Sequence, residues 1–158
     1  MKKSKKDSMR KDTIAILQPV LQKPEVEEMK LFIQHGKMTT YEHCINVAVT
    51  CYILAMKFKL KLNIEVLVLS AFLHDFYLYD WHKTKVKGHL HGFVHSKIAG
   101  INAGKLLNQP QQVTDVIETH MWPLTFRHIP RTKEGWIVCF VDKYVSMKES
   151  LRGLFGGK

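Results

Sequence analysis

The stretch IEVLVLSAFL at residues 64–73, followed at once by His74 and Asp75, decides how this chain folds. Its residues are apolar on nearly all sides, which predicts a helix buried at the centre of the protein. Asn63 is a suitable N-cap for that helix. The pair His74-Asp75 then lies at the C-terminal end of a buried helix, where a polar group left without a partner costs several kcal/mol.

Two other polar residues occupy similar positions in the chain. His43 opens a helical stretch that continues CINVAVTCYILA, and the run WIVCFV leads directly into Asp142. Buried imidazole and carboxylate groups change their protonation unless they are paired or bind a metal. Four such groups from three separate segments therefore indicate one shared partner, most simply a metal ion.

The order of His43, His74-Asp75 and Asp142 resembles the signature of the HD superfamily of metal-dependent phosphohydrolases. The resemblance extends over about residues 35 to 150, and the segments YLYDWH, HGFVH and HMWPL resemble those of small, uncharacterised bacterial members. It implies an all-helical fold with one or two divalent metals on the H, HD and D residues. It also implies hydrolysis of phosphate esters of nucleotides or related compounds.

His95 and His120 extend this pattern. Each shares a helical face with apolar residues, so both side chains are expected to point inward. The order H, HD, H, H, D resembles the two-metal branch of the family, in which the two intermediate histidines bind the second ion. Met121 follows His120 where some relatives have a second histidine, and the alternative for both residues is an ordinary histidine of the core.

Mixed imidazole and carboxylate ligands suit iron, manganese, cobalt, nickel or zinc, and they suit magnesium less well. The sequence does not choose among these metals, nor between one ion and two. Asp75 is the residue best placed to bridge two ions, because a carboxylate has two oxygens. We assign the catalytic role to Asp75 and His74, with metal-activated water as the attacking group.

Basic residues close to these motifs are candidates for binding a phosphate group, although each is also an ordinary surface charge in the alternative interpretation. We predict substrate contacts for Lys83, Lys143, Arg127 and His91, the last because it lies four positions before His95. Further candidates are Lys85, Lys97 and Arg131, with Tyr79, Trp81 and Trp122 as rings that could stack on a base.

The main functional hypothesis is a metal-dependent phosphohydrolase that cleaves a phosphate ester or anhydride of a nucleotide or related small compound. Two alternatives remain open from the sequence: a nucleotide-binding regulator that has lost turnover, and an oxygenase with a di-iron pair on the same fold. The oligomeric state is not predicted.

Composition and charge limit the other possibilities. The net charge is +10, and residues 1–11 carry +5 of it with six Lys or Arg and one Asp, so we expect a disordered basic tail there and the HD domain over 12–158. Nucleic-acid binding is not expected, because aromatic residues do not alternate with the basic ones. Three cysteines without a CxxC pair predict a reduced, cytoplasmic protein.

Capping and breaking residues predict an all-α, single-domain antiparallel bundle of about six or seven helices. Thr39 and Glu42 form a capping box for the segment that carries His43. The apolar runs are too short to span a membrane, and no strand is expected. Residues 77–94 form a long connection. A first short helix is expected from Asp12 to near Pro19 or Pro24, and further helices are expected at about 24–35, 40–58, 64–75, 95–108, 110–121 and 133–150.

Overall fold

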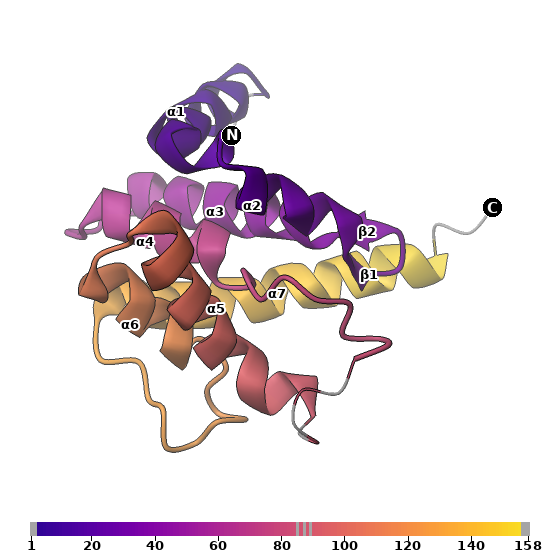
Figure 1. Ribbon diagram of the computed structural model, residues 1–158. Coiled ribbons are helices and arrows are strands. Elements are labelled where there is room, and N and C mark those ends of the chain that lie inside the picture. The colour runs from indigo at the N-terminus through magenta and orange to yellow at the C-terminus, as the bar shows by residue number, and fades with distance from the viewer. Residues whose placement is uncertain (1–2, 85, 87, 89, 156–158) are drawn as a thin grey trace.

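Helices form almost all of the regular structure in the computed structural model, which describes residues 3–84, 86, 88 and 90–155. Within these residues there are seven α-helices, one short 3₁₀ helix and a two-stranded hairpin (Figure 1). The prediction of an all-α fold is confirmed. None of the helices in the described part of the chain has the length and apolar composition required to cross a lipid bilayer.

Helices α3 (Thr40–Lys57) and α4 (Ile64–Leu73) form the centre of the molecule. The capping box predicted for α3 is present, since the Thr39 side chain accepts from the Glu42 backbone and the Glu42 side chain accepts from the Thr39 backbone. Asn63 caps α4 through a bond from the backbone of Val66. All residues of α4 from Val66 onward are buried, as its composition predicts.

Helix α7 (Lys133–Phe155) runs antiparallel to α3, and the two cross the middle of the molecule in Figure 1. The start of α3 therefore lies beside the later turns of α7, where His43 Nδ1 is 2.7 Å from Glu149 Oε2. This arrangement brings Asp142 next to the first turn of α3. Residues from two segments that are far apart in the sequence therefore meet at one site.

Helices α5 (His91–Leu107) and α6 (Gln111–Thr119) pack against each other, and α6 also packs on α4. Asn108 ends α5 in the left-handed conformation with φ 52°, and Pro110 precedes α6. Helix α5 begins four residues earlier than the sequence predicts. The long connection after residue 77 is shorter as a result, and His91 belongs to the first turn of α5.

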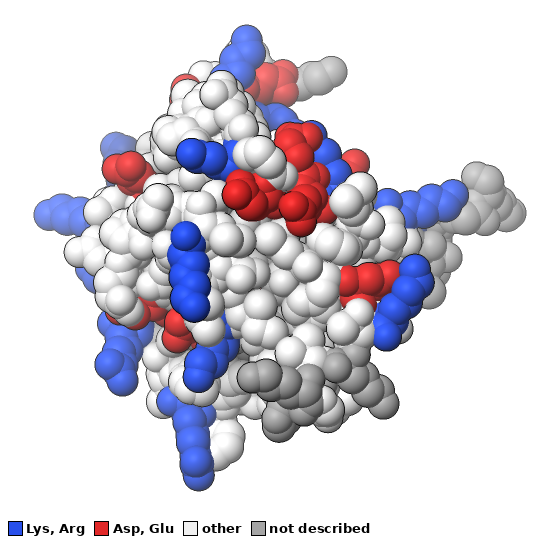
Figure 2. Space-filling view, in the orientation of Figure 1, with Lys and Arg blue, Asp and Glu red and all other residues white. Residues whose placement is uncertain are grey.

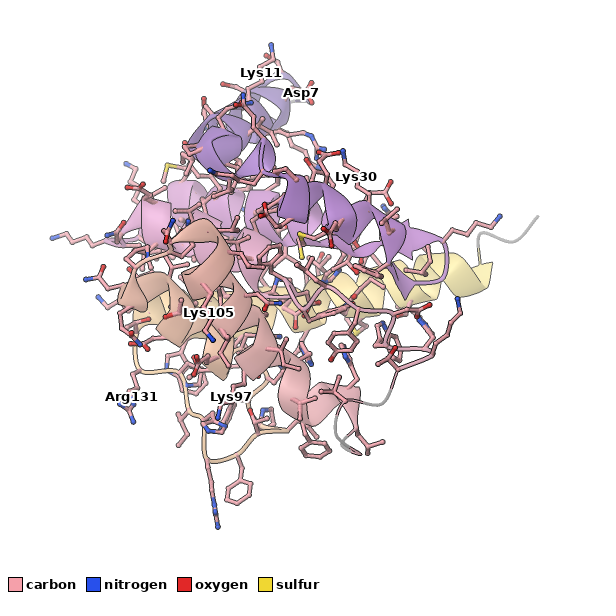
Figure 3. All side chains as sticks on the ribbon, in the orientation of Figure 1. Asp7, Lys11, Lys30, Lys97, Lys105 and Arg131 are labelled. Carbon is pink, nitrogen blue, oxygen red and sulfur yellow. The ribbon has the colours of Figure 1, made fainter. Side chains whose placement is uncertain are left out.

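Helix α1 (Lys3–Leu21) includes the segment for which a disordered tail was expected. Met9, Thr13 and Leu17 lie at helical spacing and are buried, and Thr13 Oγ1 donates to Met9 O at 2.8 Å. The helix packs on α3 and α4, and its residues Lys5, Lys6 and Lys11 are exposed; Lys11 is labelled in Figure 3. The many charged residues of this segment make its buried face hard to recognise in the sequence. Residues 3–11 are part of a helix, where a disordered tail was expected.

The segment before α3 also differs from the prediction of a single helix over 24–35. It forms α2 (Pro24–Glu27), the 3₁₀ helix η1 (Glu28–Leu31), and the strands β1 (Ile33–His35) and β2 (Met38–Thr39). Gly36 occupies the turn with φ 59°, a conformation that favours glycine. The hairpin was not predicted, and it turns the side chain of Gln34 into the core.

Uncharged residues make up most of the face of the molecule shown in Figure 2. Lys and Arg are spread among them, and the largest group of acidic side chains lies near the upper centre, with others at several separate places. The described basic residues visible there do not form the continuous stripe that follows a nucleic-acid backbone.

Replacing Thr39 by Ala removes the capping box of α3. We expect the free energy of unfolding to fall by about 1 kcal/mol, because a lost Ser or Thr cap leaves backbone donors unsatisfied. Chemical denaturation measures this change. Thr39→Ser, which retains the hydroxyl, is the matched control, and equal stabilities of the Ala and Ser variants would contradict the assigned role.

Candidate metal centre

Six buried side chains from five helices or helix ends converge at one point of the core. All six were predicted from the sequence as metal ligands, and the most exposed of them, Asp142, is only 7% exposed. The six are His43, His74, Asp75, His95, His120 and Asp142.

The first group of donor atoms lies between α3, the end of α4 and α7. His43 Nε2 is 3.2 Å from Asp142 Oδ1, and His74 Nε2 is 3.4 Å from the same oxygen. Asp75 Oδ2 completes the group at 3.3 Å from His74 Nε2 and 4.0 Å from His43 Nε2. The spacing suits a cation held among four side chains.

The second group lies on the other side of the Asp75 carboxylate. Asp75 Oδ1 is 3.2 Å from His95 Nε2 and 3.8 Å from His120 Nε2, and these two nitrogens are 3.1 Å apart. The two oxygens of Asp75 therefore face two different sets of imidazoles. This is the geometry expected of a bridging carboxylate.

Each imidazole is held with its Nδ1 on an acceptor and its Nε2 toward the centre. His43 Nδ1 donates to Glu149 Oε2, at 2.7 Å. In the other three cases the acceptor is a backbone carbonyl of the preceding turn: Ala71 for His74, His91 for His95 and Ile117 for His120, at 2.9, 3.0 and 2.7 Å. A proton on Nδ1 leaves the lone pair on Nε2, which is the form that binds a metal.

Some of the donor atoms at the centre lack a hydrogen-bond partner in the described part of the chain, and a bound metal would provide one contact for each of them. His74 Nε2 and Asp75 Oδ1 are buried and make no hydrogen bond within the described residues. The Nε2 atoms of His95 and His120 face each other at 3.1 Å, and both are directed at Asp75 Oδ1. Buried lone pairs of nitrogen and oxygen that converge in this way fit a divalent transition metal.

Two helix C-termini add to this preference for a cation. His74 is the C-cap of α4, and His120 is the C-cap of α6. The C-terminal end of a helix carries a partial negative charge. Both helices therefore direct this charge toward the place where the donor atoms meet.

The ionisation of the carboxylates follows from their neighbours. Burial raises the pKa of Asp75 and of Asp142, but the adjacent imidazoles outweigh it and hold both pKa values well below the usual range. Burial, together with His74 and His95, lowers the pKa of His120 to about 3. The two carboxylates are thus charged, and the His120 ring is neutral near pH 7.

His43 differs from His120. Burial lowers the pKa of His43, but its hydrogen bonds to Asp142 and Glu149 outweigh this and raise the pKa to about 9. A proton on His43 compensates the carboxylates when no other cation does so. A metal ligand must give up that proton, so metal binding at this site would release protons.

Glu149 contacts a candidate ligand and was not identified from the sequence. It accepts from His43 through Oε2, and its Oε1 accepts from Asn46 Nδ2 at 2.9 Å. Glu149 lies seven residues after Asp142, two turns along α7 on the same face, and this spacing is the signal that could have identified it. Such a carboxylate fixes a ligating histidine and raises its basicity.

The predicted substrate contact of Lys143 differs from what the structure shows. Its ammonium donates to the backbone carbonyls of His120, at 2.9 Å, and Cys139, at 3.2 Å. Carbonyls at the end of a helix lack intrahelical partners, and Lys143 satisfies one at the end of α6. It supports the segment that carries a ligand, and its donors are directed at the protein itself.

The other predicted cations lie on the surface. Lys83 is 84% exposed and pairs with Asp80 at 3.1 Å, and Arg127 is exposed beside a cavity of about 380 Å³. None of the six candidate ligands lines that cavity. Lys97 and Arg131 are also exposed (Figure 3). Lys85 lies outside the described residues.

His91 is the predicted substrate-binding residue that the structure does bring to the site. Its ring stacks on that of His95, with centroids 4.4 Å apart, and on that of Trp81 at 5.1 Å. Tyr79 contacts His91 Nδ1 through its hydroxyl at 2.9 Å. Burial and the neighbouring His95 lower the pKa of His91 to about 4, so its ring is neutral near pH 7. Trp122, in contrast, packs edge-on against Trp136.

Comparison with known families agrees with this geometry. A family profile described as HD domain matches residues 40–147, which is more than half of the chain. This chain therefore belongs to the HD-domain family, whose members are generally metal-dependent hydrolases. Searches among curated proteins and among solved structures each gave no match.

We predict that the protein binds two ions and that His120→Ala retains about one, because His120 belongs mainly to the second group of donors. Elemental analysis of the purified proteins measures the stoichiometry. His128→Ala, which removes an exposed histidine, should retain both ions. One ion in the wild type and in His120→Ala would restrict the site to the first group.

Replacing Glu149 by Ala should weaken metal binding by about 10–100-fold, the usual effect of removing a partner of a ligating histidine. Competition with a chelator measures the affinity. Glu149→Gln keeps an acceptor for His43 and should fall between the wild type and the Ala variant. An unchanged affinity of Glu149→Ala would show that this carboxylate does not act on the metal site.

Proposed function

We propose that this protein is a metal-dependent phosphohydrolase that cleaves a phosphate ester or anhydride bond of a nucleotide or related small phosphate compound. The observation that carries the proposal is the Asp75 carboxylate, whose two oxygens face two separate groups of imidazole nitrogens. When bound there, divalent ions such as iron, manganese, cobalt, nickel or zinc stabilise charge on a phosphoryl group and lower the pKa of water.

The residues of the chain prepare the site for that chemistry. His43, His74 and Asp142 present their donor atoms to one side of Asp75, and their burial excludes bulk water. The fixed Nδ1 bonds keep the imidazoles from rotating, so the ligands need little reorganisation. We retain the catalytic assignment of Asp75 and His74, which lie next to each other at the end of α4.

His91 is the best candidate for a residue that contacts the substrate. It lies between the ring of Trp81 and the ligand His95, and it is polar but uncharged near pH 7. The net charge of +10 favours a small anionic substrate, because a positive surface increases the local concentration of anions. In this proposal, the exposed side chains of Lys83 and Arg127 contribute to the positive potential at the surface.

The same ligand set also suits a di-iron pair, so an oxygenase is the second candidate. The supporting observation is the combination of four imidazoles with one terminal and one bridging carboxylate, which iron accepts readily. Oxygen uptake by the iron-loaded protein would distinguish it from a hydrolase. Tight nucleotide binding without phosphate release would instead indicate a regulator.

A cytoplasmic location is part of the proposal. It is supported by the cysteines Cys44, Cys51 and Cys139, all of which are buried thiols that form no disulfide. Such thiols are typical of proteins in reducing compartments.

We expect the protein loaded with Mn, Co, Ni or Fe to release phosphate from at least one member of a panel of nucleotides, dinucleoside polyphosphates and simple phosphate esters. Asp75→Ala should lose both bound metal and activity, because it removes the donor shared by the two groups. Asp115→Ala, an exposed acid on α6, is the control that should keep both. A metal-loaded and active Asp75→Ala protein would contradict the proposal, as would an inactive wild type across the panel.

A further inference from the structure

A second cluster of buried polar side chains lies directly behind Asp75. Gln34 on β1, Thr40 at the start of α3 and Tyr77 after α4 form it, and they are 8%, 1% and 2% exposed. Gln34 Nε2 lies 2.6 Å from Asp75 Oδ2, a short contact for an amide and a carboxylate. The cluster thus joins three segments of the chain to one oxygen of the bridging carboxylate.

The amide of Gln34 has only one orientation that satisfies its neighbours. Its Oε1 accepts from the Tyr77 hydroxyl, and Thr40 Oγ1 lies 3.3 Å from the same oxygen. A carboxylate only accepts, so the Nε2 end of the amide must face Asp75. The hydroxyls of Thr40 and Tyr77 are 3.1 Å apart and support each other.

This arrangement leaves the two oxygens of Asp75 unlike each other. Oδ2 accepts from Gln34, whereas Oδ1 is buried without a hydrogen-bond partner among the described residues. An aspartate side chain can rotate its carboxylate plane, because this terminal torsion has a broad energy profile. A donor fixed to Oδ2 limits that rotation and keeps Oδ1 directed at His95 and His120.

We propose that Gln34 is a positioning residue for the metal centre, which holds the Asp75 carboxylate in the orientation that presents one oxygen to each group of ligands. The inference rests on the metal centre proposed above, and it adds a residue outside the ligand set. It also gives a role to the hairpin before α3. The backbone of Thr40 donates to Phe32 O at 2.8 Å, and this bond fixes β1 against the first turn of α3.

The decisive variant is Gln34→Leu, which keeps a similar volume and removes the donor. We expect the dissociation constant for Co²⁺ or Mn²⁺ to rise by about 10–100-fold, as for other partners of metal ligands. The visible absorption spectrum of the Co²⁺ form should also change, because it reports ligand geometry. Gln111→Leu is the matched control, since Gln111 Nε2 also lies 2.6 Å from a carboxylate, Asp115, but on the exposed side of α6.

A role in stability alone would give a different result. If Gln34→Leu only lowers the melting temperature of the metal-free protein, and its metal affinity and Co²⁺ spectrum match those of the wild type, the positioning role is overturned. An affinity loss and a spectral change in Gln34→Leu, with both unchanged in Gln111→Leu, support it.

Tyr77→Phe gives an independent test that does not alter Gln34 itself. Without the hydroxyl the amide of Gln34 is less firmly oriented, so metal affinity should fall by less than in Gln34→Leu. In the Gln34→Leu background the same change should have no further effect, because residues that act through one another are not additive. Full additivity of the two affinity losses would overturn the inference.

The same measurements separate this inference from the proposed function. A wild-type protein that binds no divalent transition metal would overturn both. A wild type that binds metal, together with a Gln34→Leu variant that binds it equally well, would overturn the positioning role and leave the metal centre intact.

Discussion

The structure depends on the burial of two ionised carboxylates, Asp75 and Asp142, in the centre of a small helical protein. A buried charge is tolerated only when it is paired and hydrogen-bonded or binds a metal. Here four imidazoles surround the two carboxylates. The apolar helix α4 buries this cluster, and the antiparallel pair of α3 and α7 brings His43 and Asp142 together from residues far apart in the sequence.

Helix ends account for much of the precision of the site. His74 and His120 each follow the last turn of a helix, and each uses its Nδ1 to satisfy a carbonyl of that turn. In both residues the bond from Nδ1 to the last turn of the helix favours the tautomer with a free Nε2. Lys143 donates to the carbonyl of His120 and extends this pattern outward. The contacts that stabilise these helix ends therefore also orient the candidate ligands.

The sequence predicted those parts of the molecule that depend on local signals. The capping residues Thr39 and Asn63 were visible because a cap acts within one turn. The six candidate ligands were visible as polar residues at the ends or on the faces of apolar helices, and the structure places them together. Their binding of metal remains a prediction.

Other parts depend on contacts between distant segments, and the sequence did not reveal them. Gln34 lies on a strand that pairs with β2, and Phe32, just before this strand, accepts from the backbone of Thr40. Glu149 resembles a solvated charge near the end of a helix until α3 is placed beside it. The many lysines of α1 led to the prediction of a disordered tail, although one face of this helix is buried. Lys143 was interpreted as a phosphate ligand because its position next to Asp142 does not reveal the carbonyls that it meets.

The negative charge of the cluster can be compensated in two ways, by a proton or by a metal ion. The carboxylates of Asp75 and Asp142 and two helix C-termini make the centre electronegative. In the absence of a metal, a proton on His43 compensates part of that charge, since its pKa is raised to about 9 despite burial. A divalent ion bound there would replace the proton and use the lone pair that it occupied. Either cation would supply the positive charge that the buried carboxylates require.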